Sequence, residues 1–88
     1  MDVRIELVVD KFCLSMEMCH SMVFSLSRDF DNIEIVMRTV EPDSRLLKDF
    51  GIHILPSWLL NDKVLHINPY DYDAIKNKVH ECLDTFAA

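Results

Sequence analysis

The chain has 88 residues, half of them hydrophobic, and carries a formal net charge of −6. A chain of this length is expected to form one domain, residues 1–88, because either half alone would bury too little apolar surface to fold. Its 15 acidic residues outnumber the 9 lysines and arginines, and the basic residues form no cluster, which argues against nucleic acid and anionic membrane as partners.

The chain is expected to be cytoplasmic. Its longest apolar runs fall well short of the roughly 20 residues that a membrane-spanning helix needs. Residues 1–12 carry charges that are unlike the apolar centre of a signal peptide. The three cysteines Cys13, Cys19 and Cys82 are too few for a disulfide framework, and cytosolic cysteines are normally reduced.

The first half of the chain predicts a strand, a helix and a second strand. Residues 4–9, R-I-E-L-V-V, become continuously apolar, as in a central strand covered on both faces. After a short loop, the apolar residues of segment 13–30 recur at intervals of three and four positions. This spacing predicts a helix that begins at Cys13. Residues 33–40 are alternating and β-branched, which predicts the second strand. The predicted apolar face of the helix consists of Met16, Cys19, Val23, Leu26 and Phe30, widened by Leu14, Met18 and Met22.

A short helix and a turn come next. Asp43 or Ser44 can cap this helix at its start, and Gly51, the one glycine of the sequence, stops it. Pro56 then opens an apolar run. Proline is tolerated at the first residue of a strand, because its missing N–H breaks no bond of the ladder there.

The last third of the chain predicts a hairpin and a helix. The strands cover residues 57–60 and 63–67, joined by an Asn-Asp turn, and Asp71 is the candidate cap of the final helix. The order is therefore β-α-β-α-β-β-α. The first β-α-β is expected to be a right-handed parallel unit, extended by the antiparallel hairpin into a four-stranded mixed sheet with helices on both faces.

Three stretches resemble the thioredoxin-fold superfamily, and in particular the short glutaredoxin-like thioredoxins. They are R-I-E-L-V-V followed by F-C, then F-G-I-H-I-L-P-S leading into W-L-L-N, and N-D-K-V-L-H-I. The resemblance covers residues 4–83 and implies a role in thiol-disulfide exchange. It also implies that Pro56 is the cis proline facing the site cysteine, in a substrate groove formed with Phe12, Leu55 and Ser57.

The redox motif departs from the C-x-x-C of that family. It reads C-L-S-M here, with Cys13 as the nucleophile candidate and Met16 in the place of the resolving cysteine. A second register, M-E-M-C, would put Met16 first and Cys19 last. The first register is preferred, because the second needs a longer loop and a shorter helix.

The chemistry expected of Cys13 follows from its position. A cysteine at a helix N-terminus gains thiolate character, and Lys11 would add a nearby positive charge. Cys13 can then form mixed disulfides with protein thiols or glutathione, although Met16 cannot resolve them. Cys19 is the alternative thiol, but six helical residues span about 9 Å, whereas the Cα atoms of a disulfide lie within about 7 Å. Cys19 and Cys82 are therefore interpreted as packed, inert thiols.

No metal and no cofactor are expected. Residues 16–22 combine thioether, thiol and imidazole groups, which are soft metal ligands. Helical geometry places these groups on different edges of the helix, so a single metal ion would not reach all of them. Two hypotheses remain: a thiol redox protein that acts through Cys13, and a redox-inactive binding or scaffold module that uses the groove beside Pro56. Met16 favours the second for ordinary disulfide reduction and leaves single-thiol chemistry open.

Overall fold

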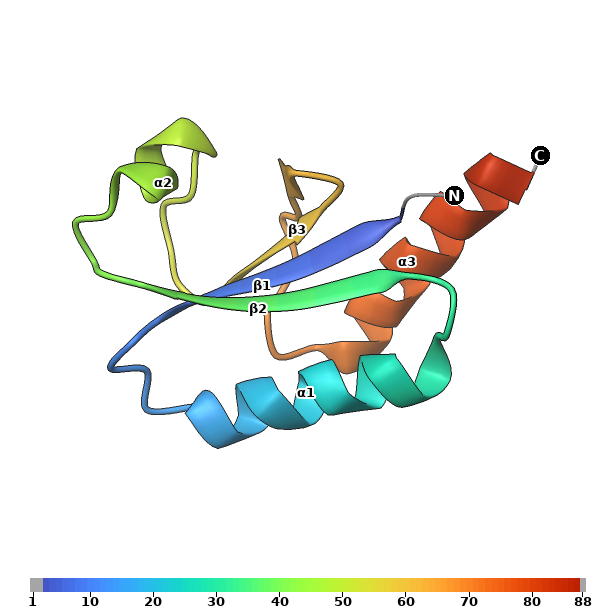
Figure 1. Ribbon diagram of the computed structural model, residues 1–88, viewed down its shortest axis with the longest axis horizontal. Coiled ribbons are helices and arrows are strands. Elements are labelled where there is room, and N and C mark those ends of the chain that lie inside the picture. The colour runs from blue at the N-terminus through green and yellow to red at the C-terminus, as the bar shows by residue number, and fades with distance from the viewer. Residues whose placement is uncertain (1–2, 88) are drawn as a thin grey trace.

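The computed structural model describes the backbone of residues 3–87 and the side chains of residues 3–85. The predicted domain, residues 1–88, therefore extends beyond the described residues at both ends. The elements are, in chain order, β1 (Arg4–Asp10), α1 (Met16–Asp29), β2 (Glu34–Val40), α2 (Arg45–Asp49), β3 (Ser57–Leu60), β4 (Lys63–Val64) and α3 (Tyr72–Ala87) (Figure 1).

The strands form one mixed sheet in the order β2-β1-β3-β4. β1 and β2 are parallel, and Ile5 lies opposite Ile35. β3 is antiparallel to both β1 and β4. The predicted α/β class and the four-stranded mixed sheet are confirmed. A helix joins β1 to β2 because two parallel neighbours need a long crossover connection, whereas β3 and β4 are joined by a two-residue turn.

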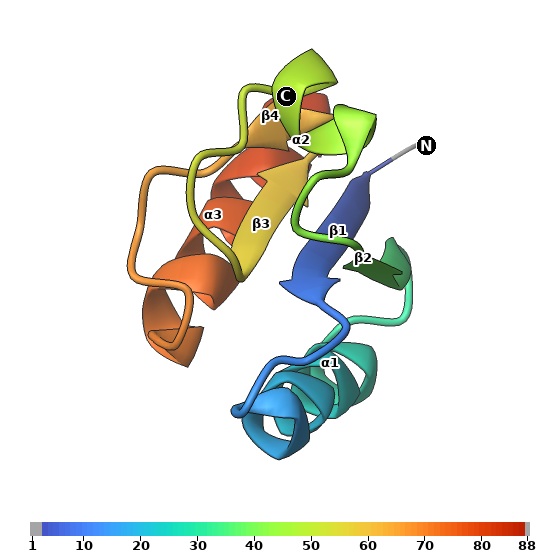
Figure 2. The ribbon, with the colours of Figure 1, turned by 90° about the vertical axis from the view of Figure 1, so that its left-hand side faces the viewer.

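Helices cover both faces of the sheet. Successive side chains of β1 point to opposite sides, so its apolar residues need cover on each face. Ile5, Leu7 and Val9 belong to the cluster that α1 and α3 cover. Val8 belongs to a smaller cluster on the other face, beside α2. Figure 2, which looks at the sheet from one end, shows α2 on one side and α1 and α3 on the other. The short α2 covers only part of its face.

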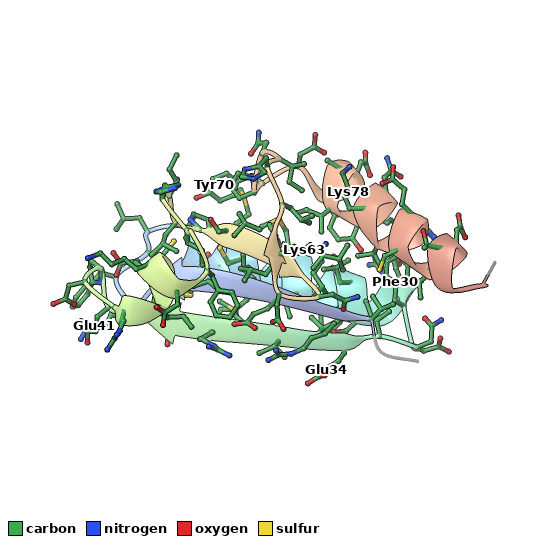
Figure 3. The ribbon with its side chains drawn as sticks, turned by 90° about the horizontal axis from the view of Figure 1, so that it is seen from above. Phe30, Glu34, Glu41, Lys63, Tyr70 and Lys78 are labelled. Carbon is green, nitrogen blue, oxygen red and sulfur yellow. The ribbon has the colours of Figure 1, made fainter. Side chains whose placement is uncertain are left out.

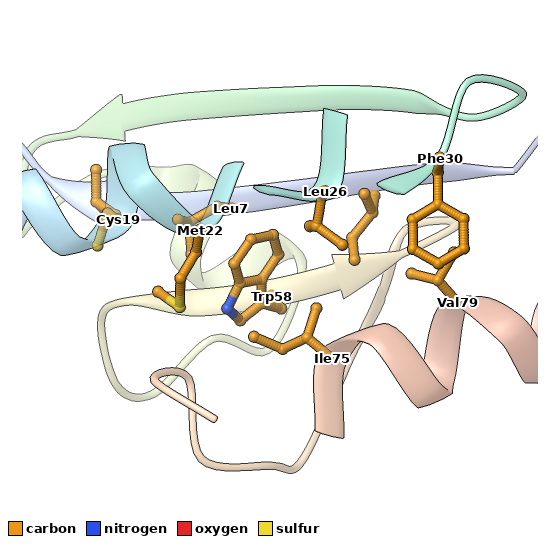
Figure 4. Close-up of a cluster of buried hydrophobic side chains, with 10 residues drawn as sticks. Leu7, Cys19, Met22, Leu26, Phe30, Trp58, Ile75 and Val79 are labelled. Carbon is orange, nitrogen blue, oxygen red and sulfur yellow. The ribbon is translucent and has the colours of Figure 1, made fainter. Parts of the chain in front are cut away.

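Trp58 of β3 lies at the centre of the larger cluster and is 1% exposed. Figure 4 shows its indole among Met22 and Leu26 of α1 and Ile75 of α3. The ring therefore joins the sheet to both of the helices that cover this face. On α1 the buried residues are Cys19, Met22 and Leu26. Two residues that were expected on the buried face, Leu14 and Met18, are exposed.

The ends of α2 and α3 follow the sequence signals. Ser44 caps α2, its Oγ accepting a hydrogen bond from the amide of Leu46 at 3.3 Å. Gly51 follows with φ of +69°, the left-handed conformation that ends many helices and that glycine adopts without strain. At α3, the Asp71 carboxylate accepts a bond from the amide of Ala74 at 3.1 Å, as expected of an N-cap.

The second hairpin strand is shorter than predicted: β4 ends at Val64, not at residue 67. The amide of Leu65 still donates to the Trp58 carbonyl at 2.8 Å. Beyond that point the chain leaves the sheet edge, and the indole N–H of Trp58 donates to the Pro69 carbonyl at 2.9 Å. The core tryptophan therefore holds the loop that precedes α3.

A polar contact fastens the end of α1 to the start of α3. The hydroxyl of Tyr72 donates to Asp29 Oδ2 at 2.7 Å, and the charged groups of Arg28 and Lys76 each lie 3.3 Å from an Asp29 carboxylate oxygen. The bond from Tyr72, followed by that from Arg28, lowers the pKa of Asp29 from 3.8 to about 2. Burial, then Asp29, raises the pKa of Tyr72.

We expect acid to weaken this contact. Because the folded-state pKa of Asp29 lies below its unfolded value, its contribution is complete above pH 3.8 and is lost as the pH falls towards about 2. A Tyr72→Phe variant should be less stable than the wild type near neutral pH, and the difference should shrink over that acid range. Urea unfolding at each pH measures it. Tyr70→Phe is the matched control, since Tyr70 bonds a neutral serine, and its difference from the wild type should not change with pH. A constant gap for Tyr72→Phe would contradict the prediction.

Candidate functional site

Cys13 lies on a turn and not on a helix, so the predicted start of the first helix is wrong. α1 begins at Met16, and its first backbone bond runs from the Cys19 amide to the Ser15 carbonyl, 3.0 Å. Asp10 holds the preceding turn: its carboxylate accepts from the amide of Phe12 and its carbonyl from the amide of Cys13, both at 2.9 Å. An aspartate that bonds nearby amides competes with helix formation, which explains the delay.

The positive charge expected beside Cys13 is engaged elsewhere. Lys11 Nζ lies 2.6 Å from Glu41 Oε1, in an ion pair between the ends of β1 and β2. The same ammonium lies 5.0 Å from the centre of the Phe12 ring. Lys11 therefore neutralises Glu41, and support for a Cys13 thiolate has to come from other groups.

Cys13 lies in a groove with Pro56. The groove has a volume of about 460 Å³ and brings together two segments more than forty residues apart, one after β1 and one before β3. The peptide bond between Leu55 and Pro56 is cis. The groove is lined by Asp10, Cys13, Leu14, Ser15, Leu55, Pro56 and Tyr70.

The other predicted site residues lie outside the groove lining. Phe12 is 72% exposed and points its ring towards Lys11. Ser57 donates its hydroxyl to the Ile54 carbonyl. Met16 is half-buried and packs against the larger core cluster. Cys13, Leu55 and Pro56 thus line one groove, and Phe12, Met16 and Ser57 are not part of its lining.

Four residues of the groove lining were not predicted as site residues, and two of these, Ser15 and Tyr70, are linked to Cys13 by hydrogen bonds. Ser15 Oγ lies 3.1 Å from the Cys13 sulfur and 2.7 Å from the hydroxyl oxygen of Tyr70. Tyr70 lies on the loop before α3, as Figure 3 shows. Ser15 lies inside the C-L-S-M motif, two residues after Cys13, so this spacing could have predicted its contact with the Cys13 sulfur. Tyr70 is 55 residues from Ser15, and no local pattern announces such a contact.

The ionisation state of Cys13 fixes the direction of these bonds. A thiolate sulfur carries no hydrogen and can only accept, so Ser15 must then donate to it. The Ser15 oxygen is left to accept from Tyr70, and the bonds form a chain in which each polarises the next. Ser15 is also the N-cap residue of α1, yet its side chain makes no capping bond within the described residues. A missing cap costs a helix about 1 kcal/mol, and here the hydroxyl serves Cys13 instead.

Cys19 and Cys82 occupy different environments. Cys19 is fully buried, and burial, followed by the neighbouring Cys13, raises the pKa of its thiol. Cys82 is half-buried on α3, and its sulfur lies 3.7 Å from Asn61 Nδ2. All three thiols are free.

Two kinds of feature are absent from the described part of the chain. Residues 3–87 hold no group of three or more His, Cys, Asp or Glu side chains placed to bind a metal ion. Within the same residues, no helix has the length and apolar character needed to cross a membrane.

Comparison with known proteins establishes the fold. No protein-family model matches the sequence, and no curated protein does. The structure is similar to that of the thioredoxin NaTrxh from Nicotiana alata, with a TM-score of 0.73 and 17% identity over 90% of this chain and 71% of that one. It is also similar to a structure described as the basis of the thiol resolving mechanism in yeast mitochondrial 1-Cys peroxiredoxin via glutathione/thioredoxin systems. That match has a TM-score of 0.72 and 15% identity, over 91% and 78% of the two chains. The chain therefore has the thioredoxin fold.

Proposed function

We propose that the protein carries out thiol-disulfide exchange, with Cys13 as the nucleophile. The observation that carries the proposal is the placement of the Cys13 sulfur in a groove beside Pro56 and within 3.1 Å of the Ser15 hydroxyl. A reactive thiol needs access to its substrate and a group that stabilises its thiolate. The groove supplies the access, and the Ser15 hydroxyl, itself bonded to Tyr70, is placed to donate a hydrogen bond to the sulfur.

The reaction begins when a disulfide enters the groove between Cys13 and the Leu55–Pro56 wall. The Cys13 thiolate attacks one sulfur of that disulfide, the other sulfur leaves as a thiolate, and the substrate stays on Cys13 as a mixed disulfide. Protein disulfides and oxidised glutathione both contain this group. The exposed, apolar Leu14 at the groove edge offers contact to the apolar part of a substrate.

This function is the one expected of a short glutaredoxin-like protein that works in the cytoplasm. The three thiols form no disulfide with one another, which is compatible with reducing conditions, under which cysteines are kept reduced. The thioredoxin fold and the single-thiol motif C-L-S-M support the same assignment.

Insulin reduction by dithiothreitol tests the proposal. The wild type should accelerate the precipitation of reduced insulin above the uncatalysed rate, because Cys13 relays exchange to the dithiol. Cys13→Ser should return the rate to the uncatalysed value. Cys82→Ala is the matched control, since Cys82 lies on α3 beside Asn61, and should retain the wild-type rate. A wild type that equals Cys13→Ser would overturn the proposal.

A second candidate is a binding or scaffold module without redox turnover. Met16, in the place of the family's second cysteine, packs against the core. The large apolar side chain of Leu14 stands exposed in the groove lining, and that of Ile54, next to Leu55 in the chain, is exposed as well. Such a surface suits an extended apolar segment of another protein. In the insulin assay this function predicts an inactive wild type and an active Met16→Cys variant, because the variant restores a C-x-x-C motif.

A further inference from the structure

We infer that Cys13 and Cys19 form a redox pair, in which Cys19 resolves the mixed disulfide on Cys13 by closing an intramolecular disulfide. The inference deepens the proposed function and rests on it for the first step. The spacing is C-x-x-x-x-x-C, and the resolving thiol lies one helical turn further along than the position occupied by Met16.

The two cysteines meet at Ser15. The Cys13 sulfur lies 3.1 Å from Ser15 Oγ, and the Cys19 amide donates to the Ser15 carbonyl at 3.0 Å. Cys13 also packs against the larger core cluster, of which Cys19 is a buried member. Figure 4 shows Cys19 at one end of that cluster, on the first turns of α1. Both thiols therefore border the same corner of the core.

The distance of about 9 Å in the sequence-based prediction assumed a helix from Cys13 onward, and it does not apply because α1 begins only at Met16. Only Met16 to Cys19 is helical, a rise of about 4.5 Å. The residues between Cys13 and Met16 belong to a turn, in which the chain does not advance along a helix axis. Helical side chains point back towards the N-terminus, over the preceding turn. The Cys19 side chain therefore extends towards Ser15 and the turn that carries Cys13.

The environment of each thiol suits its part in the exchange. Cys13 is partly exposed in the groove, so it can meet a substrate. Cys19 is 0% exposed, so it is shielded from outside disulfides, and Cys13 packs against the cluster of which Cys19 is a member. Burial, followed by the proximity of Cys13, raises the pKa of Cys19, so resolution should quicken as the pH rises.

The exchange balances in two steps. Cys13 attacks the substrate disulfide and releases one substrate thiol, which takes up the Cys13 proton. Cys19 then loses its proton and attacks the Cys13 sulfur. The bond between Cys13 and the substrate breaks, and the second substrate thiol leaves with that proton. The substrate disulfide is reduced to two thiols, and the Cys13 and Cys19 thiols are oxidised to one disulfide.

Oxidised glutathione and peptide mapping by mass spectrometry test the pair. In the wild type we expect a product two hydrogens lighter than the reduced protein, with Cys13 linked to Cys19 and little glutathione retained. Cys19→Ala should instead keep glutathione on Cys13 as a lasting adduct. Cys82→Ala is the matched control, since it also removes one thiol other than Cys13, and should behave like the wild type.

The outcomes separate the pair from the proposed exchange. A wild type that retains glutathione on Cys13 as fully as Cys19→Ala, or that links Cys13 to Cys82, overturns the pair and leaves exchange at Cys13 standing. If glutathione modifies Cys13 in neither protein, oxidation by diamide tests the pair instead, because this azo oxidant takes up the two thiol hydrogens directly. A Cys13–Cys19 disulfide made by diamide then supports the pair and overturns exchange with glutathione, whereas its absence overturns both. The wild-type measurements decide the pair even if Cys19→Ala fails to fold.

Discussion

Replacing Trp58 with alanine should lower the free energy of unfolding by about 3–5 kcal/mol. Trp58 is 1% exposed and lies between the sheet and both covering helices, so its removal leaves a large cavity that three elements would have to close. The substitution also removes the donor to the Pro69 carbonyl. A domain of this size is stabilised by only about 5–15 kcal/mol in total, so the variant should be close to unfolding.

Urea unfolding followed by circular dichroism measures the loss. Phe24→Ala is the control, because Phe24 is also a large aromatic residue but lies 69% exposed on α1, and its loss should stay within about 0.5 kcal/mol. Trp58→Phe should lie in between, since it keeps an aromatic ring but loses the indole N–H. Equal effects of Trp58→Ala and Phe24→Ala would show that the indole does not join the layers as described.

The residues that specify the fold act locally, which is why the sequence predicts it well. The apolar run of β1, the Ser44 cap, the Gly51 stop and the Asp71 cap each work within a few residues. Their order along the chain then leaves few topologies, because parallel neighbours need a crossover helix and antiparallel neighbours need only a turn. The mixed sheet follows from these signals together.

The two errors in the predicted elements have long-range or competing causes. α1 starts late because the Asp10 carboxylate and carbonyl take up the amides of Phe12 and Cys13, which an apolar repeat does not reveal. β4 stops early while the indole of Trp58, from the neighbouring strand, holds the Pro69 carbonyl. These hydrogen bonds lie outside the regular ladder or helix, and periodicity carries no information about them.

The candidate site was predictable only where the motif carried it. Cys13 and Pro56 were found through the spacing of the resemblance, and the structure places both in one groove. Tyr70 was missed because its contact with Ser15 depends on how the loop before α3 folds back. Trp58 anchors that loop through Pro69, the residue before Tyr70. The core therefore positions one end of the hydrogen-bond chain that reaches Cys13, a dependence that a linear sequence does not display.

Replacing Ser15 with alanine should slow the alkylation of Cys13 by roughly tenfold near neutral pH. The Ser15 hydroxyl lies 3.1 Å from the sulfur and is the group that can donate to it when Cys13 is a thiolate. A hydrogen bond to a charged group is worth about 1.5 kcal/mol or more, and the loss of such a bond from the reacting sulfur corresponds to roughly tenfold in rate. Iodoacetamide with mass mapping of the modified cysteine measures the rate.

Two variants separate the hydrogen-bond chain from a general effect of losing a hydroxyl on α1. Ser27→Ala removes a hydroxyl that donates to the Val23 carbonyl on the same helix, and should leave the rate unchanged. Tyr70→Phe should slow Cys13 by less than Ser15→Ala, because Ser15 still donates to the sulfur but is no longer polarised by the tyrosine. If Cys13 were alkylated at the same rate in Ser15→Ala and Ser27→Ala, Ser15 would have no role in the site. The proposed hydrogen-bond chain to Cys13 would then fail, and Lys11, which is paired with Glu41, is not placed to replace it.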